Sequence, residues 1–194
     1  MIGRDDITGI VLCGGDARRM DGVDKPLQLL AGRPLVAHVC ARLAPQVSRV
    51  VMSANRSLTE YAVVSDTVVR DSTPGLGPLG GIVSALAVVT TPWAFCCPGD
   101  APLLHETIVS RLAQHASDDV DVLVPHDGVQ RQPLFVLLRA GVREGIADYL
   151  LSGARSVHGW VATQRVVEVP MADAASHFLN INTWETLALA GAAH

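Results

Sequence analysis

Short apolar runs alternate along the chain with segments in which apolar residues recur every three to four positions. The runs are typical of buried strands, and the three-to-four spacing is typical of helices with one buried face. This alternation predicts an α/β fold built on a doubly wound, mainly parallel sheet. The predicted strands are 10–12, 50–52, 68–69, 93–97, 120–124, 133–138 and 166–169, and the predicted helices are 35–43, 57–64, 79–89, 108–115 and 142–151, with a last helix from Thr183.

One stretch departs from this alternation. Residues 133–138 follow a His-Asp-Gly turn, so we expect them to pair antiparallel with strand 120–124. Residues 126–165 are the best candidate for a short antiparallel excursion from the sheet, and 157–161 fits a helix or a strand equally well. Because the chain contains no internal repeat, its 194 residues predict a single domain, residues 1–194.

Polar residues directly follow several predicted strands. They are the segment 14–25 after the first strand, Ser53 after the second, Asp71 after the third and Asp100 after the fourth. Ligands of doubly wound sheets bind beyond the carboxyl ends of the strands. The placement of these residues therefore predicts one shared ligand site.

The segment after the first strand combines glycines with positive charge. Gly14 and Gly15 allow another group to approach the backbone N–H groups, and Arg19 and Lys25 follow in the same loop. Amides and cations together favour a polyphosphate. The alternative is a tight strand-to-helix turn with a solvated charged face. The loop is neither a P-loop, which needs Ser or Thr after the lysine, nor a G-x-G-x-x-G dinucleotide fingerprint.

Residues 10–27 as a whole resemble the signature of the nucleotidyltransferases related to molybdenum cofactor guanylyltransferase. The family pattern is roughly Leu-Ala-Gly-Gly-x-Ala-x-Arg-Met followed by Asp-Lys. This chain has Cys13 at the usual alanine and Pro26 at a common glycine. Both differences leave the phosphate-binding groups in place.

Three further segments narrow the resemblance to the guanylyltransferase. They are Ser-Ala-Asn-Arg at 53–56, Gly-Pro-Leu-Gly-Gly at 77–81 and Asn-Ile-Asn-Thr at 180–183. The resemblance implies a Rossmann-like nucleotidyltransferase fold that binds GTP. The family often has asparagine where this chain has Ser53, whose shorter reach is expected to weaken the preference for GTP over CTP. The GTP-binding residues implied are Leu12, Cys13, Gly14, Gly15, Lys25, Ser53, Asp71 and Asp100.

Asp100 lies in the segment Cys-Pro-Gly-Asp-Ala-Pro, between two prolines that restrict the backbone. It is either a turn aspartate that caps the next helix or a ligand for Mg²⁺, which often takes only one or two carboxylates and fills its shell with water and phosphate oxygens. The family carries its metal aspartate in a segment of this type. The resemblance therefore implies Mg²⁺ as cofactor, with Asp100 as its ligand.

The resemblance also implies an acceptor side of the site, at Gly80, Arg155, Asn180 and Asn182. The two asparagines, separated by one residue, point the same way on an extended stretch. Arg155 falls in a segment similar to the family's Gly-Glu-Arg-Arg, with a serine at the second arginine. The alternative is that the asparagines only shape the turn before Thr183.

The implied reaction transfers GMP from Mg·GTP to the terminal phosphate of Mo-molybdopterin and releases pyrophosphate. Arg19, Lys25 and Asp100 would carry the catalysis by positioning and charge neutralisation. Related alternatives are a cytidylyltransferase acting on the same cofactor and a sugar-phosphate nucleotidyltransferase. A GTP-binding sensor would not need a placed metal carboxylate, and an NAD-dependent oxidoreductase would need the missing fingerprint.

Composition excludes several other functions. A net charge of −4 with 4% aromatic residues does not favour nucleic-acid binding. No stretch approaches the roughly 18 apolar residues of a membrane span, and the first residues contain no signal-peptide core. The four cysteines lack zinc-site spacing and indicate buried, reduced thiols in a cytoplasmic protein. The expected partners are GTP and Mo-molybdopterin, for a monomer with transient contacts to molybdenum cofactor enzymes.

Overall fold

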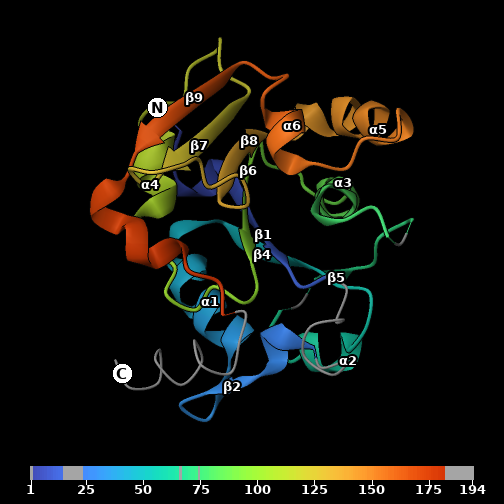
Figure 1. Ribbon diagram of the computed structural model, residues 1–194. Helices are drawn as coiled ribbons and strands as arrows, with labels where there is room; N and C mark the ends of the chain where they lie inside the picture. The colour runs from blue at the N-terminus through green and yellow to red at the C-terminus, as the bar shows by residue number, and fades with distance from the viewer. Residues whose placement is uncertain (1, 15–23, 66, 74, 182–194) are drawn as a thin grey trace.

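The computed structural model describes residues 2–14, 24–65, 67–73 and 75–181 (Figure 1). Within them, a seven-stranded sheet has the order β5-β4-β1-β6-β8-β7-β9, and every pairing is parallel except the two made by β8. The predicted fold class is therefore confirmed. The strands are β1 (Ile7–Leu12), β4 (Arg49–Ser53), β5 (Val68–Val69), β6 (Trp93–Pro98), β7 (Val122–His126), β8 (Val136–Arg139) and β9 (Val166–Pro170), and a separate antiparallel pair is β2 (Leu29–Leu30) with β3 (Arg33–Pro34).

Strand β8 accounts for the excursion that the sequence predicts. It pairs antiparallel with β7, as expected, at Val122 with Leu138. It also pairs with β6, at Cys96 with Val136, and so lies inside the sheet. Its first three residues are buried, which suits a strand covered on both faces. The antiparallel part of residues 126–165 is therefore a strand within the sheet, and α5 and α6 follow it outside the sheet.

Helices cover both faces of the sheet (Figure 1). One face packs against α3, α5 and α6, and the other against α1, α4 and the 3₁₀ segment η6. The segment 157–161 is helical, and the Ser156 side chain caps it by accepting the Gly159 N–H at 3.1 Å. The helices are α1 (Leu35–Leu43), α2 (Leu58–Tyr61), α3 (Pro78–Leu86), α4 (Ile108–Ala113), α5 (Arg143–Leu151) and α6 (Val157–Val161), and the 3₁₀ segments are η1 (Arg4–Asp6), η3 (Lys25–Leu27), η4 (Ala44–Gln46), η5 (Ala140–Val142) and η6 (Ala172–Phe178).

The core lies on both sides of the central strands. Cys96 packs with the α3 layer and Cys97 with the α1 layer, which is the opposite orientation expected of neighbours on a strand. All four cysteines are buried and free, as the sequence predicts. Gly9 of β1 is required by close packing, because a Cβ there would lie 2.8 Å from Leu43 Cδ2 of α1.

The order of the strands sets the position of the candidate site. β1 lies between β4 and β6, and its last residue, Leu12, pairs with Ser53 on one side and Pro98 on the other. The carboxyl ends of three parallel strands therefore meet at one edge, where the segments after them come together. No described helix is long and apolar enough to cross a membrane.

Candidate functional site

Polar side chains join the end of β4 and the residues just beyond it to the segment after β5. Ser53 Oγ donates to Asp71 Oδ1 at 3.1 Å, and Asn55 Nδ2 donates to Asp71 Oδ2 at 2.8 Å. Asn55 Oδ1 accepts the Asp71 backbone N–H at 3.0 Å. We call Ser53, Asn55 and Asp71 the Asp71 cluster. Ser53 and Asp71 were predicted site residues; Asn55 was missed, although it lies in the Ser-Ala-Asn-Arg segment.

The first turn of α3 packs against this cluster through glycine. A Cβ at Gly81 would lie 2.7 Å from Ser53 Oγ and 3.5 Å from Asp71 Oδ1. Any larger residue would displace the buried serine. Gly80, a predicted acceptor residue, is buried beneath the preceding loop, with Leu76 Cβ 2.8 Å from its notional Cβ.

The end of β1 lies between the Asp71 cluster and Asp100. The Cys13 N–H donates to the Ser53 carbonyl at 2.8 Å, and the Leu12 carbonyl accepts the Gly99 N–H at 2.9 Å. The backbone at Gly14 approaches the cluster, since a Cβ there would lie 3.7 Å from Asn55 Nδ2. Of the other loop residues predicted to bind phosphate, Gly15 and Arg19 lie outside the described residues and Lys25 begins η3.

Asp100 lies on the other side of β1, just after β6, and is half-buried. Burial raises the pKa of its carboxyl, while the nearby Lys25 ammonium acts in the opposite direction. The Asp100 carbonyl accepts the Ile181 N–H at 2.8 Å, so the end of the described chain returns to this point. The neighbouring Asn180 has a buried Oδ1 that no described residue contacts with a hydrogen bond. Asn182 lies outside the described residues.

The residue before Lys25, Asp24, is held by Tyr61 of α2 and by Arg56, just before that helix; the sequence predicted the helix but not these contacts. Tyr61 Oη donates to Asp24 Oδ1 at 2.8 Å, and Arg56 Nε lies 3.6 Å from Asp24 Oδ2. Burial raises the pKa of the Tyr61 hydroxyl far above its usual range, so this group remains a donor. The contacts fix the backbone from which the Lys25 side chain extends. No local sequence pattern marks Tyr61 for this role.

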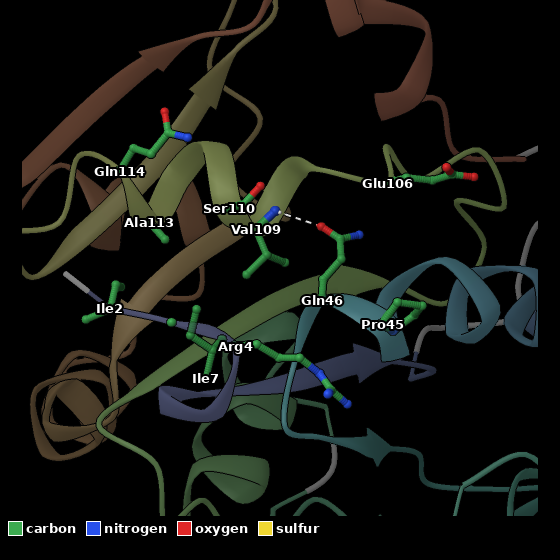
Figure 2. Close-up of a pocket in the computed structure, with 11 residues that line it drawn as sticks. Ile2, Arg4, Ile7, Pro45, Gln46, Glu106, Val109, Ser110, Ala113 and Gln114 are labelled. Carbon is green, nitrogen blue, oxygen red and sulfur yellow. Dashed lines mark hydrogen bonds between the residues drawn. The ribbon is translucent and has the colours of Figure 1, made fainter.

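A separate pocket of about 380 Å³ lies at the opposite end of the sheet, beside Ile7 at the start of β1 (Figure 2). Its Gln46 amide accepts the Val109 N–H at 3.0 Å and donates to the carbonyls of Arg42 and His105. The Gln46 amide, which connects α4 to α1, thus has its hydrogen bonds satisfied within the fold. Neither the Asp71 cluster nor Asp100 lines this pocket.

Residues 9–167, which include every described residue of the Asp71 cluster and Asp100, match the family model of the MobA-like NTP transferase domain. The chain belongs to the MobA-like NTP transferase family. Two curated relatives are named molybdenum cofactor guanylyltransferase. That of Cupriavidus metallidurans is 42% identical and the match covers 96% of this chain and 95% of the relative; that of Burkholderia orbicola is 41% identical and the match covers 94% of each.

Solved structures share the fold of this MobA-like chain. Molybdopterin-guanine dinucleotide biosynthesis protein A from Archaeoglobus fulgidus aligns with a TM-score of 0.78 at 23% identity, over 96% of this chain and 97% of that one. A nucleotidyl transferase from Methanothermobacter thermautotrophicus aligns with a TM-score of 0.73 at 19% identity, over 92% and 93% of the two chains. At these identities the likeness concerns the fold alone.

Arg155 stands apart from the other predicted residues of this MobA-like chain. Its guanidinium donates to the carbonyls of Leu150 at 2.7 Å and Ala154 at 2.6 Å. It thereby closes the loop after α5, and no hydrogen bond or ion pair joins it to Asp100 or Asn180 in the described part of the chain. Its predicted contact with the acceptor stays a prediction.

The donor atoms near Asp100 suit a hard cation such as Mg²⁺. In the described ranges no group of three or more His, Cys, Asp or Glu side chains is placed to hold a metal ion. Mg²⁺ does not require such a group, because phosphate oxygens and water complete its shell. The Asp100 carboxylate is a ligand of the right type, and the unpartnered Asn180 Oδ1 is a neighbouring oxygen that could accept from a metal-bound water.

Proposed function

We propose that this MobA-like transferase is a molybdenum cofactor guanylyltransferase, which transfers GMP from Mg·GTP to the terminal phosphate of Mo-molybdopterin and releases pyrophosphate. One observation carries the proposal. The end of β1 lies between a cluster of hydrogen-bonding groups suited to a base, centred on Asp71, and a half-buried carboxylate suited to a metal, Asp100. The name that the curated relatives share supports the same reaction.

In this proposal the triphosphate lies across the end of β1. The Gly14 and Gly15 backbone would surround it, and Arg19 and Lys25 would neutralise its charge. Asp100 would hold Mg²⁺, which supplies positive charge to the phosphate oxygens. The base and ribose would lie against Leu12, Cys13, Ser53 and Asp71.

The transfer itself needs positioning more than acid–base chemistry. An oxygen of the acceptor's phosphate forms a bond to the α-phosphorus of GTP, and the bond from that phosphorus to the bridging oxygen breaks, so that pyrophosphate leaves with the electron pair. A phosphate monoester has its second pKa near ~6 and is mostly a dianion at neutral pH, so no side chain must remove a proton. Lys25 and Arg19 would stabilise the charge that develops on the leaving group.

We propose that the acceptor binds against Gly80, Arg155, Asn180 and Asn182, of which Asn180 adjoins the residue that bonds to Asp100. The buried, unpartnered Oδ1 of Asn180 supports this assignment, since a buried amide oxygen is costly unless something donates to it. We propose the cytoplasm as the setting, because four free buried thiols persist there in reduced form.

The direct test is a transfer assay with Mo-molybdopterin, Mg²⁺ and GTP, CTP or ATP in turn. Chromatography detects the dinucleotide and a coupled assay detects pyrophosphate. We expect both products with GTP and little of either with ATP. Preferential use of CTP would replace the proposal with the related cytidylyltransferase. If the chain binds GTP but transfers no GMP in the presence of the acceptor, the GTP-binding sensor replaces the proposal.

A further inference from the structure

Asn55 holds Asp71 with both ends of its amide. The parallel pairing of Ser53 with Val69 brings the positions two residues beyond β4 and β5 opposite each other. Asn55 Nδ2 donates to the carboxylate at 2.8 Å, and Asn55 Oδ1 accepts the Asp71 N–H at 3.0 Å. The two bonds together fix the backbone at Asp71 and the rotation of its carboxylate.

Among the described residues, each oxygen of the Asp71 carboxylate accepts one hydrogen bond, so both retain free acceptor capacity. Oδ1 accepts from Ser53 and Oδ2 from Asn55, and a carboxylate oxygen can accept two hydrogen bonds. Ser53 is buried, whereas Asp71 is half-buried and Asn55 is exposed. The bond from Ser53 therefore comes from the core side, and the remaining acceptor positions are open to a ligand.

Two fixed, adjacent acceptors match one nucleotide base. Guanine carries two adjacent donors, N1–H and the 2-amino group, which a carboxylate can accept in parallel. Adenine and cytosine instead present a ring-nitrogen acceptor beside their amino group, and that acceptor would face a carboxylate oxygen without a proton between them. A site built to accept from two donors rejects bases that lack one of them.

We propose that Asn55 is the positioning residue for guanine recognition: it holds the Asp71 carboxylate so that both oxygens accept from the base. This inference rests on the proposed function, in which Asp71 lies at the base. The competing view is that Asn55 is only a latch, a residue whose hydrogen bonds hold the ends of β4 and β5 together without any role in base recognition. A latch would affect every nucleotide alike, whereas a positioning residue affects those that carry the 2-amino group.

Inosine triphosphate separates the two views, because it keeps N1–H and lacks the 2-amino group. For the wild-type chain we expect kcat/KM for GTP to exceed that for ITP by about tenfold, the value of one hydrogen bond to a charged group. Asn55→Ala should raise KM for GTP and reduce the GTP-to-ITP ratio to within about twofold, with kcat at saturating GTP little changed. The matched control is Gln164→Ala, which removes a partly exposed amide elsewhere and should keep the wild-type ratio.

A second variant keeps the test decisive in case Asn55→Ala does not fold. Asn55→Asp retains an acceptor for the Asp71 N–H and replaces the donor with a carboxylate that repels Asp71. It should be folded by circular dichroism and show the same loss of the GTP-to-ITP ratio. If Asn55→Ala unfolds, Asn55→Asp decides the question alone.

The outcomes distinguish this inference from the proposed function. If the wild-type chain binds GTP but transfers no GMP, the proposed function has failed, and the same ratio measured as dissociation constants by calorimetry still tests Asn55. Equal loss of GTP and ITP in both variants would make Asn55 a latch and overturn the inference. Equal use of GTP and ITP by the wild-type chain would also overturn it, since Asp71 would then not read the 2-amino group.

Discussion

The two groups of polar residues beside β1 are assembled in different ways. The Asp71 cluster joins residues 16 to 18 positions apart, which neighbouring parallel strands bring together. Asp100, in contrast, meets Ile181 from the far end of the described chain. The first group is held by hydrogen bonds among its own side chains, whereas the second depends on a segment that must be brought back to it.

The returning segment is η6, and contacts with the loop and helix after Asp100 hold it in place. Arg111 of α4 pairs with Asp173 at 2.8 Å, His177 Nδ1 contacts the Leu103 carbonyl at 2.6 Å, and the rings of His105 and His177 meet edge to face at 4.7 Å. The difference between the two groups indicates a division of labour. Substitutions in the Asp71 cluster should change which nucleotide is used, and substitutions around Asp100 should change whether it is transferred.

The largest expected effect is that of Asp100→Asn. Turnover at saturating Mg²⁺ should fall by about a hundredfold or more, because a charge that stabilises the transferring phosphate is lost. Burial already opposes the charged form of Asp100, as its raised pKa indicates, so the neutral variant should be at least as stable to heat as the wild type. Near-normal turnover in a folded Asp100→Asn chain would remove Asp100 from the metal site.

Lys25→Ala should weaken the binding of GTP far more than the binding of guanosine. One charge-assisted contact to a phosphate is worth about 1.5–3 kcal/mol, or roughly a ten- to hundredfold loss of affinity. Calorimetry with both ligands measures the difference, and guanosine serves as the control because it lacks the phosphates. Equal weakening of the two ligands would place Lys25 outside the phosphate site.

His177→Ala tests whether the returning segment supports transfer. The variant loses the contact with the Leu103 carbonyl and the edge contact with His105. We expect a loss of about 1 kcal/mol in the free energy of unfolding and a several-fold lower kcat, with KM for GTP unchanged. His158→Ala, an exposed histidine on α6, is the matched control. A raised KM for GTP with normal kcat would mean that this segment acts on the nucleotide side instead.

The smallest expected effect is a loss of stability in acid through His105. Burial is the main cause that lowers the pKa of His105, and the neighbouring His177 and Arg111 add to it. The folded chain therefore binds fewer protons at this site than the unfolded chain does. The stabilisation that neutral His105 gives the folded chain is complete above the ordinary histidine pKa of about 6.5. It is lost as the pH falls below that value. Thermal unfolding from about pH 8 to pH 5 should show a shallower decline in His105→Gln than in the wild type; identical declines would assign the effect to other groups.

The sequence could predict features that depend on local patterns, and it could not predict contacts that depend on how distant segments pair. The strand ends and the residues that follow them could be located, because apolar runs mark the strands and parallel sheets bind ligands at that edge. Ser53, Asp71 and Asp100 were predicted in this way to lie at that edge, where the structure has them; their roles stay predictions. Asn55 and Tyr61 were not predicted, since their partners become apparent only once the register of β4 with β5 and the position of α2 are known.

The position of β8 shows the same limit. Its pairing with β7 follows from the turn between them, and that prediction is confirmed. Its position between β6 and β7 depends on pairing with β6, which is distant in the sequence, and no local sequence pattern predicts that pairing. Arg155 is a further case, because its motif resembles the family's, whereas its contacts with Leu150 and Ala154 follow from how the chain leaves α5.

The most direct test of the division between the two groups is calorimetry of GTP and CTP, in the presence of Mg²⁺, with the wild-type chain, Asn55→Ala and Asp100→Asn. Binding is measured without acceptor, so an inactive variant is as informative as an active one. We predict that Asp100→Asn weakens the binding of GTP and of CTP by a similar factor, so the ratio of their dissociation constants stays at the wild-type value. Asn55→Ala should bring the two dissociation constants closer together. A ratio altered by Asp100→Asn and preserved in Asn55→Ala would contradict the account.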